Sequence, residues 1–214
     1  MAGCGCGHNI TFDGTSQQYK TVLWIVIAIN ITMFFVEMGA SIPSESLALR
    51  ADALDFFGDS LTYSITLIAI GHAVHWRASA ALFKGMTLAA MGLWVLGSTI
   101  YRVFVLQQPN EFIMSTIALL AFSANVASAL LLLKYRNGDA NVRSVWLCSR
   151  NDAIGNLAVL AAAGCIYLTQ TPWPDLMVAF LMATLFLHSA FLITRQASQE
   201  LNLLRKTTSV NAQQ

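Results

Sequence analysis

Three carboxylates lie close together in an otherwise apolar stretch of the chain. The segment Ala51–Ser60 reads ADALDFFGDS and contains Asp52, Asp55 and Asp59. On a helix, Asp55 and Asp59 share one face about one turn apart, because residues four positions apart stack along the axis. A carboxylate at the centre of a membrane helix costs about 2.5–3.5 kcal/mol, so it needs a partner or a function. Two carboxylates on one face indicate a site for a polyvalent cation or for protons.

A second pair with the same spacing occurs in the segment SVWLCSRNDAIGN, where Cys148 and Asp152 are four residues apart. Two helices that each present such a pair can close a tetrahedral site from Asp55, Asp59, Cys148 and Asp152. Thiolate and carboxylate ligands in tetrahedral geometry suit zinc and, through the softness of sulfur, cadmium. Taken alone, Cys148 would more often be a small buried residue, so the prediction depends on both pairs together.

Three further polar residues lie in apolar stretches. Arg150 is two residues from both Cys148 and Asp152, so it points to another helix face and is free to neutralise Glu37 or Asp52. Glu37 should lie near the outer end of its span, where it pairs with another group or lines a wet path. For Asn30 we expect an interhelical hydrogen bond, which asparagine often supplies inside membranes.

The composition predicts the elements that must position these residues. Of the 214 residues, 56% are hydrophobic and 11% are charged, whereas soluble domains are about 25% charged. Several apolar stretches reach the roughly 20 residues that cross a bilayer. We therefore predict an all-α polytopic membrane protein with six transmembrane helices. The expected spans are about 21–42, 47–75, 80–105, 112–133, 143–168 and 172–193.

The domain organisation follows from these spans. We expect a polar arm over residues 1–18, a six-helix transmembrane domain over 19–198 and a short cytoplasmic tail over 199–214. No cleavable signal peptide is visible, because the first twenty residues lack an apolar centre. In the arm, Cys4, Cys6 and His8 could bind a metal together, although a Gly-rich terminus is more often a mobile tail.

The basic residues predict the orientation. If the N-terminus is cytoplasmic, nine basic residues lie on the inner side and only Arg50 and Arg102 on the outer side, which satisfies the positive-inside rule. Both termini should therefore be cytoplasmic. The nine are Lys20, Arg77, Lys84, Lys134, Arg136, Arg143, Arg195, Arg205 and Lys206.

The stretch SLALRADALDFFGDS resembles the second-helix signature of the cation diffusion facilitators, which export zinc and cadmium. That signature pairs a His or Asp with an Asp four residues later, here Asp55 and Asp59. In the fifth-helix signature Asp152 matches, and Cys148 stands where the family has His or Asp. The resemblance implies a homodimeric, proton-coupled exporter of the inner membrane with alternating access. It also implies Zn²⁺ or Cd²⁺ as the transported ion, with Co²⁺ as a third candidate.

Two features depart from the family pattern. Most members carry a cytoplasmic C-terminal metal-binding domain, and we expect this chain to be a variant without it, because it ends about twenty residues after its last span. Cys148 also replaces the usual His or Asp, so the metal preference of the family cannot be carried over to this chain. Some members use ligands in the link after the second helix, where this chain has His72 and His75; interfacial histidines are more often simply hydrogen-bonded.

The carboxylates suggest a mechanism. Burial and neighbouring like charges favour the protonated form, and a divalent cation displaces those protons, which is a basis for metal/proton antiport. We expect no enzyme, resident cofactor or nucleic-acid partner. The alternatives are a metal-dependent membrane enzyme, a metal-binding membrane protein without transport, and a channel. Four protein ligands leave no open position for a catalytic water, and a tight site disfavours conduction.

Overall fold

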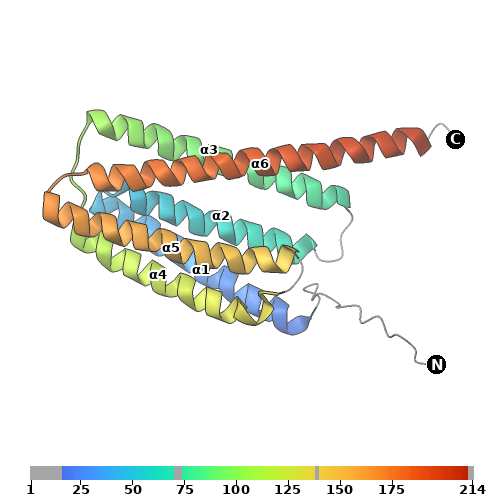
Figure 1. The fold of residues 1–214 in the computed structure, drawn as a ribbon, viewed down its shortest axis with the longest axis horizontal. Helices are drawn as coiled ribbons and strands as arrows, with labels where there is room; N and C mark the ends of the chain where they lie inside the picture. The colour runs from blue at the N-terminus through green and yellow to red at the C-terminus, as the bar shows by residue number, and fades with distance from the viewer. Residues whose placement is uncertain (1–15, 70–73, 138–139, 212–214) are drawn as a thin grey trace, which may run out of the picture.

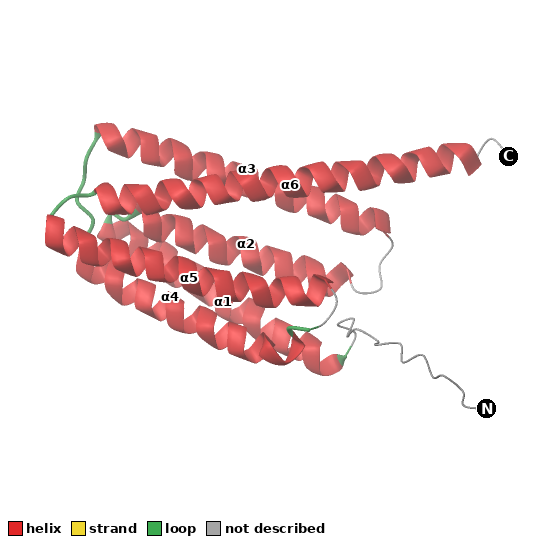
Figure 2. Ribbon diagram, in the orientation of Figure 1, coloured by secondary structure: helices red, strands yellow, loops and turns green. Residues whose placement is uncertain are grey.

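The computed structural model describes residues 16–69, 74–137 and 140–211, and these residues form an all-helical bundle (Figures 1 and 2). The six predicted helices are all present. Their bounds are α1 Gln17–Ser44, α2 Leu47–Ala69, α3 Val74–Phe104, α4 Glu111–Leu132, α5 Ala140–Thr169 and α6 Trp173–Asn211, with a short 3₁₀ turn, η1, over Leu133–Tyr135. α6 continues as one helix through residues 199–211 of the predicted tail.

Side-chain caps fix where two helices begin. The Ser16 hydroxyl accepts a hydrogen bond from the Tyr19 amide at 3.2 Å at the start of α1, and the Asn110 side chain accepts one from the Ile113 amide at 3.0 Å at the start of α4. Each cap satisfies an amide that has no partner within its own helix. The starts of α1 and α4 are therefore set by the local sequence.

The start of α2 is instead fixed by a residue from the other end of the chain. The Asp175 carboxylate, in the first turn of α6, accepts hydrogen bonds from the Ser46 hydroxyl at 2.5 Å, the Leu47 amide at 2.8 Å and the Ala48 amide at 3.1 Å. A carboxylate at a helix N-terminus is favoured by the helix dipole and by the free amides. Asp175 thus ties the helix that carries Asp55 and Asp59 to α6.

The helices form two groups, which Figure 1 shows as layers. α1, α2, α4 and α5 pack against one another, and α3 and α6 pack along each other as a separate pair. Glycines on α3 allow this pair to approach closely: a Cβ added at Gly92 would lie 2.9 Å from Leu187 Cγ of α6, and one at Gly85 would overlap the Thr194 hydroxyl. Small residues at helix contacts are a common feature of membrane bundles.

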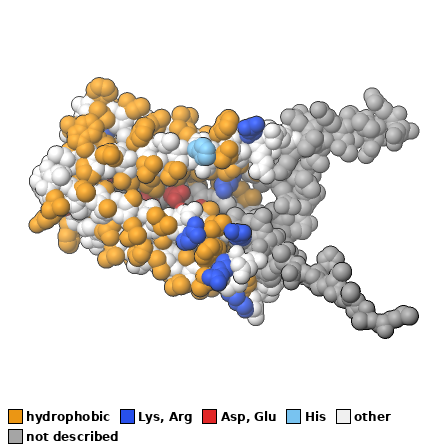
Figure 3. Space-filling view, viewed as in Figure 1, with side chains coloured by type: hydrophobic (Ala, Val, Ile, Leu, Met, Phe, Trp, Pro, Cys, Tyr) orange, Lys and Arg blue, Asp and Glu red, His pale blue; other side chains and the backbone are white. Residues whose placement is uncertain are grey.

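The surface of the bundle suits a lipid environment. Five of the described helices are long and apolar enough to cross a membrane, namely α1 and α3–α6. α2 is of similar length but carries Arg50 and three aspartates, and it contacts α1, α3, α5 and α6. Large hydrophobic side chains face outward over the bundle, such as Phe35, Phe83 and Phe191, and Figure 3 shows one largely apolar face. The shielding of α2 by its neighbours explains how a helix so polar lies within this bundle.

Candidate metal centre

The four predicted ligands line one cavity. Asp55 and Asp59 from α2 and Cys148 and Asp152 from α5 border a space of about 340 Å³. Residues of α3 and α6 complete its wall, so the cavity lies at the boundary between the four-helix group and the α3–α6 pair. In Figure 3, acidic atoms are visible at a hollow in the middle of the apolar face.

The cavity lies well inside the membrane-spanning part. Asp59 is about 18 Å from the start of α2, and Asp152 is about 18 Å from the start of α5, at 1.5 Å per residue. Because the two helices run in opposite directions, as Figure 1 shows, the two pairs meet near the middle of the bundle. This is the depth at which an uncompensated carboxylate is most costly.

The aspartates interact across the α2–α5 boundary. The Asp152 carboxyl interacts with those of both Asp55 and Asp59, and all three side chains are half-buried, as is Cys148. Among the described residues, no set of three or more His, Cys, Asp or Glu side chains is already in coordinating geometry. The four groups therefore surround a shared space, and a bound cation would require them to converge.

Tyr63 is a functional candidate that the sequence analysis missed. Its hydroxyl donates a hydrogen bond to Asp59 Oδ2, and it lies 3.4 Å from Ser149 Oγ and 3.5 Å from the Val145 carbonyl of α5. The side chain is fully buried. Tyr63 therefore orients Asp59 and links α2 to α5. Its position four residues after Asp59, on the same helix face, was the signal that could have revealed it.

Lys84 is a second residue whose role the sequence did not indicate, since it was predicted only to lie on the inner side of the membrane. In the structure this α3 residue lines the cavity and interacts electrostatically with Asp55 and Asp59. A cation facing several carboxylates lowers the cost of their negative charge. No spacing in the sequence could have indicated this contact, because α3 and α2 meet only through the tertiary fold.

A second acidic pair lies outside the cavity. Glu37 of α1 is fully buried and interacts electrostatically with Asp52 of α2, which is 2% exposed. Apart from this contact with each other, both carboxyl oxygens of Glu37 and one of Asp52 have no hydrogen-bond partner among the described residues. Glu37 therefore faces another carboxyl group.

The prediction for Arg150 was wrong. Its guanidinium donates hydrogen bonds to the Asn151 side chain at 3.0 and 3.4 Å and lies over the Trp146 ring at 5.3 Å. The side chain is exposed and does not reach Glu37 or Asp52. Arg150 indeed points away from the cavity, but the face it occupies is the outer surface of α5. The buried Asn30 amide nitrogen has no hydrogen-bond partner among the described residues, so it does not donate an interhelical hydrogen bond there.

The secondary metal candidates lie largely outside the described residues. Cys4, Cys6 and His8 fall within residues 1–15, and His72 falls within residues 70–73. His75 belongs to the first turn of α3, not to the end of the second span. These residues remain predictions.

The fold and the cavity together define a polytopic helical membrane protein with an acidic, thiol-containing site between two helix groups. Residues 23–202 match the cation efflux transmembrane domain family. The chain belongs to this family, which confirms the resemblance seen in the second and fifth helices.

Several curated relatives support the same assignment. The chain is 24% identical over 205 residues to the metal cation efflux system protein CzcD of Cupriavidus metallidurans, covering 90% of this chain and 64% of that protein. It is 25% identical over 207 residues to the cadmium, cobalt and zinc/H⁺–K⁺ antiporter of Bacillus velezensis (89% and 65%). It is also 25% identical over 207 residues to the zinc transporter ZitB of Pectobacterium atrosepticum (91% and 63%).

The chain spans less than two thirds of the length of these relatives. The matched part is the membrane-spanning region. The apolar spans and the bacterial relatives support a multi-pass protein of the inner membrane.

Proposed function

We propose that this protein exports divalent heavy-metal cations, Zn²⁺ or Cd²⁺ with Co²⁺ as a third candidate, in exchange for protons. Asp55, Asp59, Cys148 and Asp152 are the proposed ligands. The observation that carries the proposal is their arrangement: two pairs from two antiparallel helices line one cavity midway through the bundle. The names of the relatives, which include zinc, cadmium and cobalt transporters, support this choice of ions.

The ligand chemistry explains the choice of ion. Three carboxylates and one thiolate provide four donors, the number that zinc takes in closed tetrahedral sites. The sulfur raises affinity for soft ions such as Cd²⁺ relative to Mn²⁺ and Mg²⁺, which prefer all-oxygen shells. In the structure the donors already lie around a cavity large enough for a hydrated ion, and convergence of α2 and α5 would complete the shell.

Exchange for protons follows from competition at the same atoms. A metal ion binds only the deprotonated carboxylates and thiolate, so binding releases protons and protonation releases the metal. Lys84 supplies one positive charge to the cavity when the metal has left, and Tyr63 holds Asp59 in position in both cases. The cavity therefore needs no further residue to couple the two fluxes.

The position of the cavity suggests how access alternates. It lies between the four-helix group and the α3–α6 pair, so movement of the pair against the group would open it toward one side and then the other. Such rigid-body rocking around a fixed site is a general mode of secondary transport. Asp175, which holds α6 to the start of α2 at one end of the bundle, is placed to act as a pivot.

The proposed orientation places both termini in the cytoplasm. The first residue of α1 and the end of α6 lie at the same end of the bundle in Figure 1, as an even number of spans requires. On the face shown in Figure 3, basic side chains gather toward that end, which agrees with the positive-inside rule. We further propose a homodimer, as the family resemblance implies, and no catalytic activity.

The test is transport by the purified protein in proteoliposomes with an imposed pH gradient. Zn²⁺, Cd²⁺, Co²⁺ and Mn²⁺ are supplied outside, and a metal-sensitive dye and a pH dye inside report both fluxes. We expect Zn²⁺ and Cd²⁺ uptake that is accelerated by an outward proton gradient and accompanied by proton movement in the opposite direction. Saturable metal binding without any flux would indicate a binding protein, and flux independent of the pH gradient would exclude antiport.

A further inference from the structure

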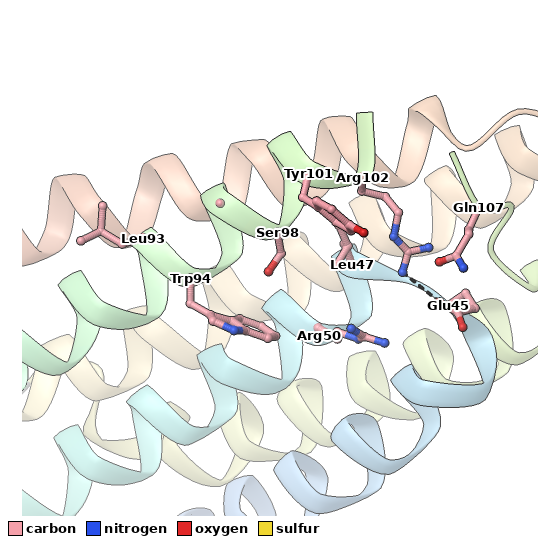
Figure 4. A pocket seen from close by; sticks show the side chains of 10 residues that line it. Glu45, Leu47, Arg50, Leu93, Trp94, Ser98, Tyr101, Arg102 and Gln107 are labelled. Atoms are coloured by element: carbon pink, nitrogen blue, oxygen red, sulfur yellow. Dashed lines mark hydrogen bonds and ion pairs between the residues drawn. The ribbon is translucent and has the colours of Figure 1, made fainter. Parts of the chain in front are cut away.

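A second cavity, of about 580 Å³, opens between α2 and α3 at the end of the bundle where α1 passes into α2 (Figure 4). It is separate from the metal centre and shares no lining residue with it. Arg50 and Arg102 border it, and they are the two basic residues that the positive-inside rule leaves on the outer side. Basic residues are scarce on the outer side, so the presence of two arginines there indicates a specific structural or binding role.

Arg102 carries a buried hydrogen-bond donor with no acceptor. Its side chain is 9% exposed, and its Nη2 donates to Glu45 Oε2 at 2.9 Å. Its Nη1 is buried and has no hydrogen-bond partner among the described residues. A guanidinium only donates, so a buried nitrogen without an acceptor carries a desolvation cost that an anion would remove.

Arg50 provides a second, weakly engaged guanidinium in the same cavity. Its one hydrogen bond among those found in the described residues is a long one of 3.5 Å from Nη2 to the Ser41 carbonyl. Arg102 interacts with two carboxylates, those of Glu45 and the buried Asp175, whereas Arg50 has no carboxylate partner among the described residues. The Arg50 guanidinium is therefore the one left to pair with a phosphodiester, because guanidinium groups match phosphate oxygens in shape and hydrogen-bond direction.

The cavity is polar at one end and apolar at the other. In Figure 4, Arg102 and Gln107 lie near Glu45, whereas Leu93 lies at the opposite end, with Trp94 beside Arg50. Leu93 is nine residues before Arg102 on α3, which is about 13 Å deeper along the helix. A phospholipid has the same layout, with a charged phosphate at the membrane surface and apolar chains below, whereas a free anion would leave the Leu93 end unused.

We propose that this cavity binds the phosphate group of an anionic membrane phospholipid. The phosphate would lie between Arg50 and Arg102, and the part of an acyl chain nearest the headgroup would lie along Trp94 and Leu93. The exposed Tyr101 ring is next to Arg102 in the sequence and also lines the cavity, and aromatic side chains of this kind favour the membrane interface. The site is independent of metal transport and would hold if the proposed ion were wrong.

The experiment is a native mass-spectrometry titration of the full chain in detergent with phosphatidylglycerol. We expect one high-affinity lipid per chain, and about tenfold weaker binding for Arg50→Gln and for Arg102→Gln, because each removes a charge-assisted hydrogen bond. The matched control is Arg195→Gln, which removes an exposed arginine of α6 outside the cavity and should leave affinity unchanged. Equal affinity in all four proteins would overturn the proposal.

Two further arms address folding and the source of the phosphate. Arg102→Lys keeps the charge opposite Glu45 but removes the second guanidinium nitrogen, so weaker lipid binding in this variant shows loss of the site without loss of the ion pair.

Inorganic phosphate and glycerophosphoglycerol are then titrated as competitors. We expect neither to displace phosphatidylglycerol at equal concentration; displacement by either would overturn the lipid assignment and identify a site for soluble anions.

Discussion

Two acidic groups lie side by side in this bundle, yet they differ in what they can contact. Asp55, Asp59 and Asp152 are half-buried and face a cavity that they share with Cys148 and Lys84. Glu37 and Asp52 are almost completely buried and face each other. Both groups consist of carboxyl groups inside the bundle, but among the described residues only the first borders a cavity with space for a cation.

The comparison shows that carboxylates of one apolar stretch need not face the same surroundings. Asp52 and Asp55 are three residues apart on α2, and both are aspartates in the same apolar stretch. The helix turn directs Asp55 toward α5 and α6 and Asp52 toward α1. We infer that the cavity group binds the transported ion, while the Glu37–Asp52 pair serves the packing of α1 against α2.

The largest effect on transport should come from removing a carboxylate that faces the cavity. Asp55→Asn, Asp59→Asn and Asp152→Asn should each abolish metal transport, because each removes a charge from the proposed ligand set. Asp52→Asn is the matched control on the same helix and should retain transport within about threefold. The measurement is initial Zn²⁺ flux in proteoliposomes, with expression and thermal unfolding as folding checks. Loss of transport in Asp52→Asn alone would reverse the assignment of the two groups.

Metal affinity should depend steeply on pH. Protons compete with the metal for the carboxylates and the thiolate, so affinity should rise with pH and fall as the pH drops. If binding displaces one to two protons, log affinity should change by about one to two per pH unit over part of the range. Isothermal titration in two buffers of different ionisation enthalpy would count the protons. A binding constant that stays flat between mildly acidic and mildly alkaline pH would exclude proton competition.

Selectivity should depend on the thiol of Cys148, one of the residues that line the cavity. Cys148→Ser replaces the soft donor with a hard one at little change in volume, so Cd²⁺ flux should fall about tenfold relative to Zn²⁺. The control is Cys165→Ser, because Cys165 is an exposed cysteine of the same helix, remote from the cavity lining. The readout is the ratio of Cd²⁺, Zn²⁺ and Mn²⁺ rates in the same vesicles. Unchanged ratios would make Cys148 a packing residue.

A smaller effect is expected from the residue that orients Asp59. Tyr63→Phe removes the hydrogen bond to Asp59 and leaves the ring, so Zn²⁺ affinity should fall by about five- to tenfold while transport persists. Tyr167→Phe, an exposed tyrosine of α5, is the control. Equal Zn²⁺ affinity in both variants would show that the Tyr63 hydroxyl does not act on the site.

The smallest effect should come from the buried pair. Glu37→Gln keeps the shape of the side chain, supplies a hydrogen-bond donor to Asp52 and cannot ionise, so the free energy of unfolding should change by no more than about 1 kcal/mol. Transport and metal affinity should stay at the level of the unmodified protein. A large loss of metal-coupled proton movement with folding intact would show that the pair takes part in transport.

Much of this architecture could be predicted from the sequence because the bilayer imposes simple rules. The length and low charge of the apolar stretches predicted six helices, and the i, i+4 spacing predicted which carboxylates share a face. Asp55, Asp59, Cys148 and Asp152 could be grouped for the same reason: local helix geometry places each pair, and the cost of buried charge requires the pairs to have a function.

Only the tertiary structure decided what surrounds those pairs. Tyr63 could have been found by spacing, but its link to Ser149, the approach of Lys84 from α3 and the capping of α2 by Asp175 join residues far apart in the chain. The direction of Arg150 also had to come from the fold, since the helix period told only which face it avoids. Contacts between helices depend on which faces pack together. The helical period of a sequence shows which residues share a face, but it does not show which other helix packs against that face.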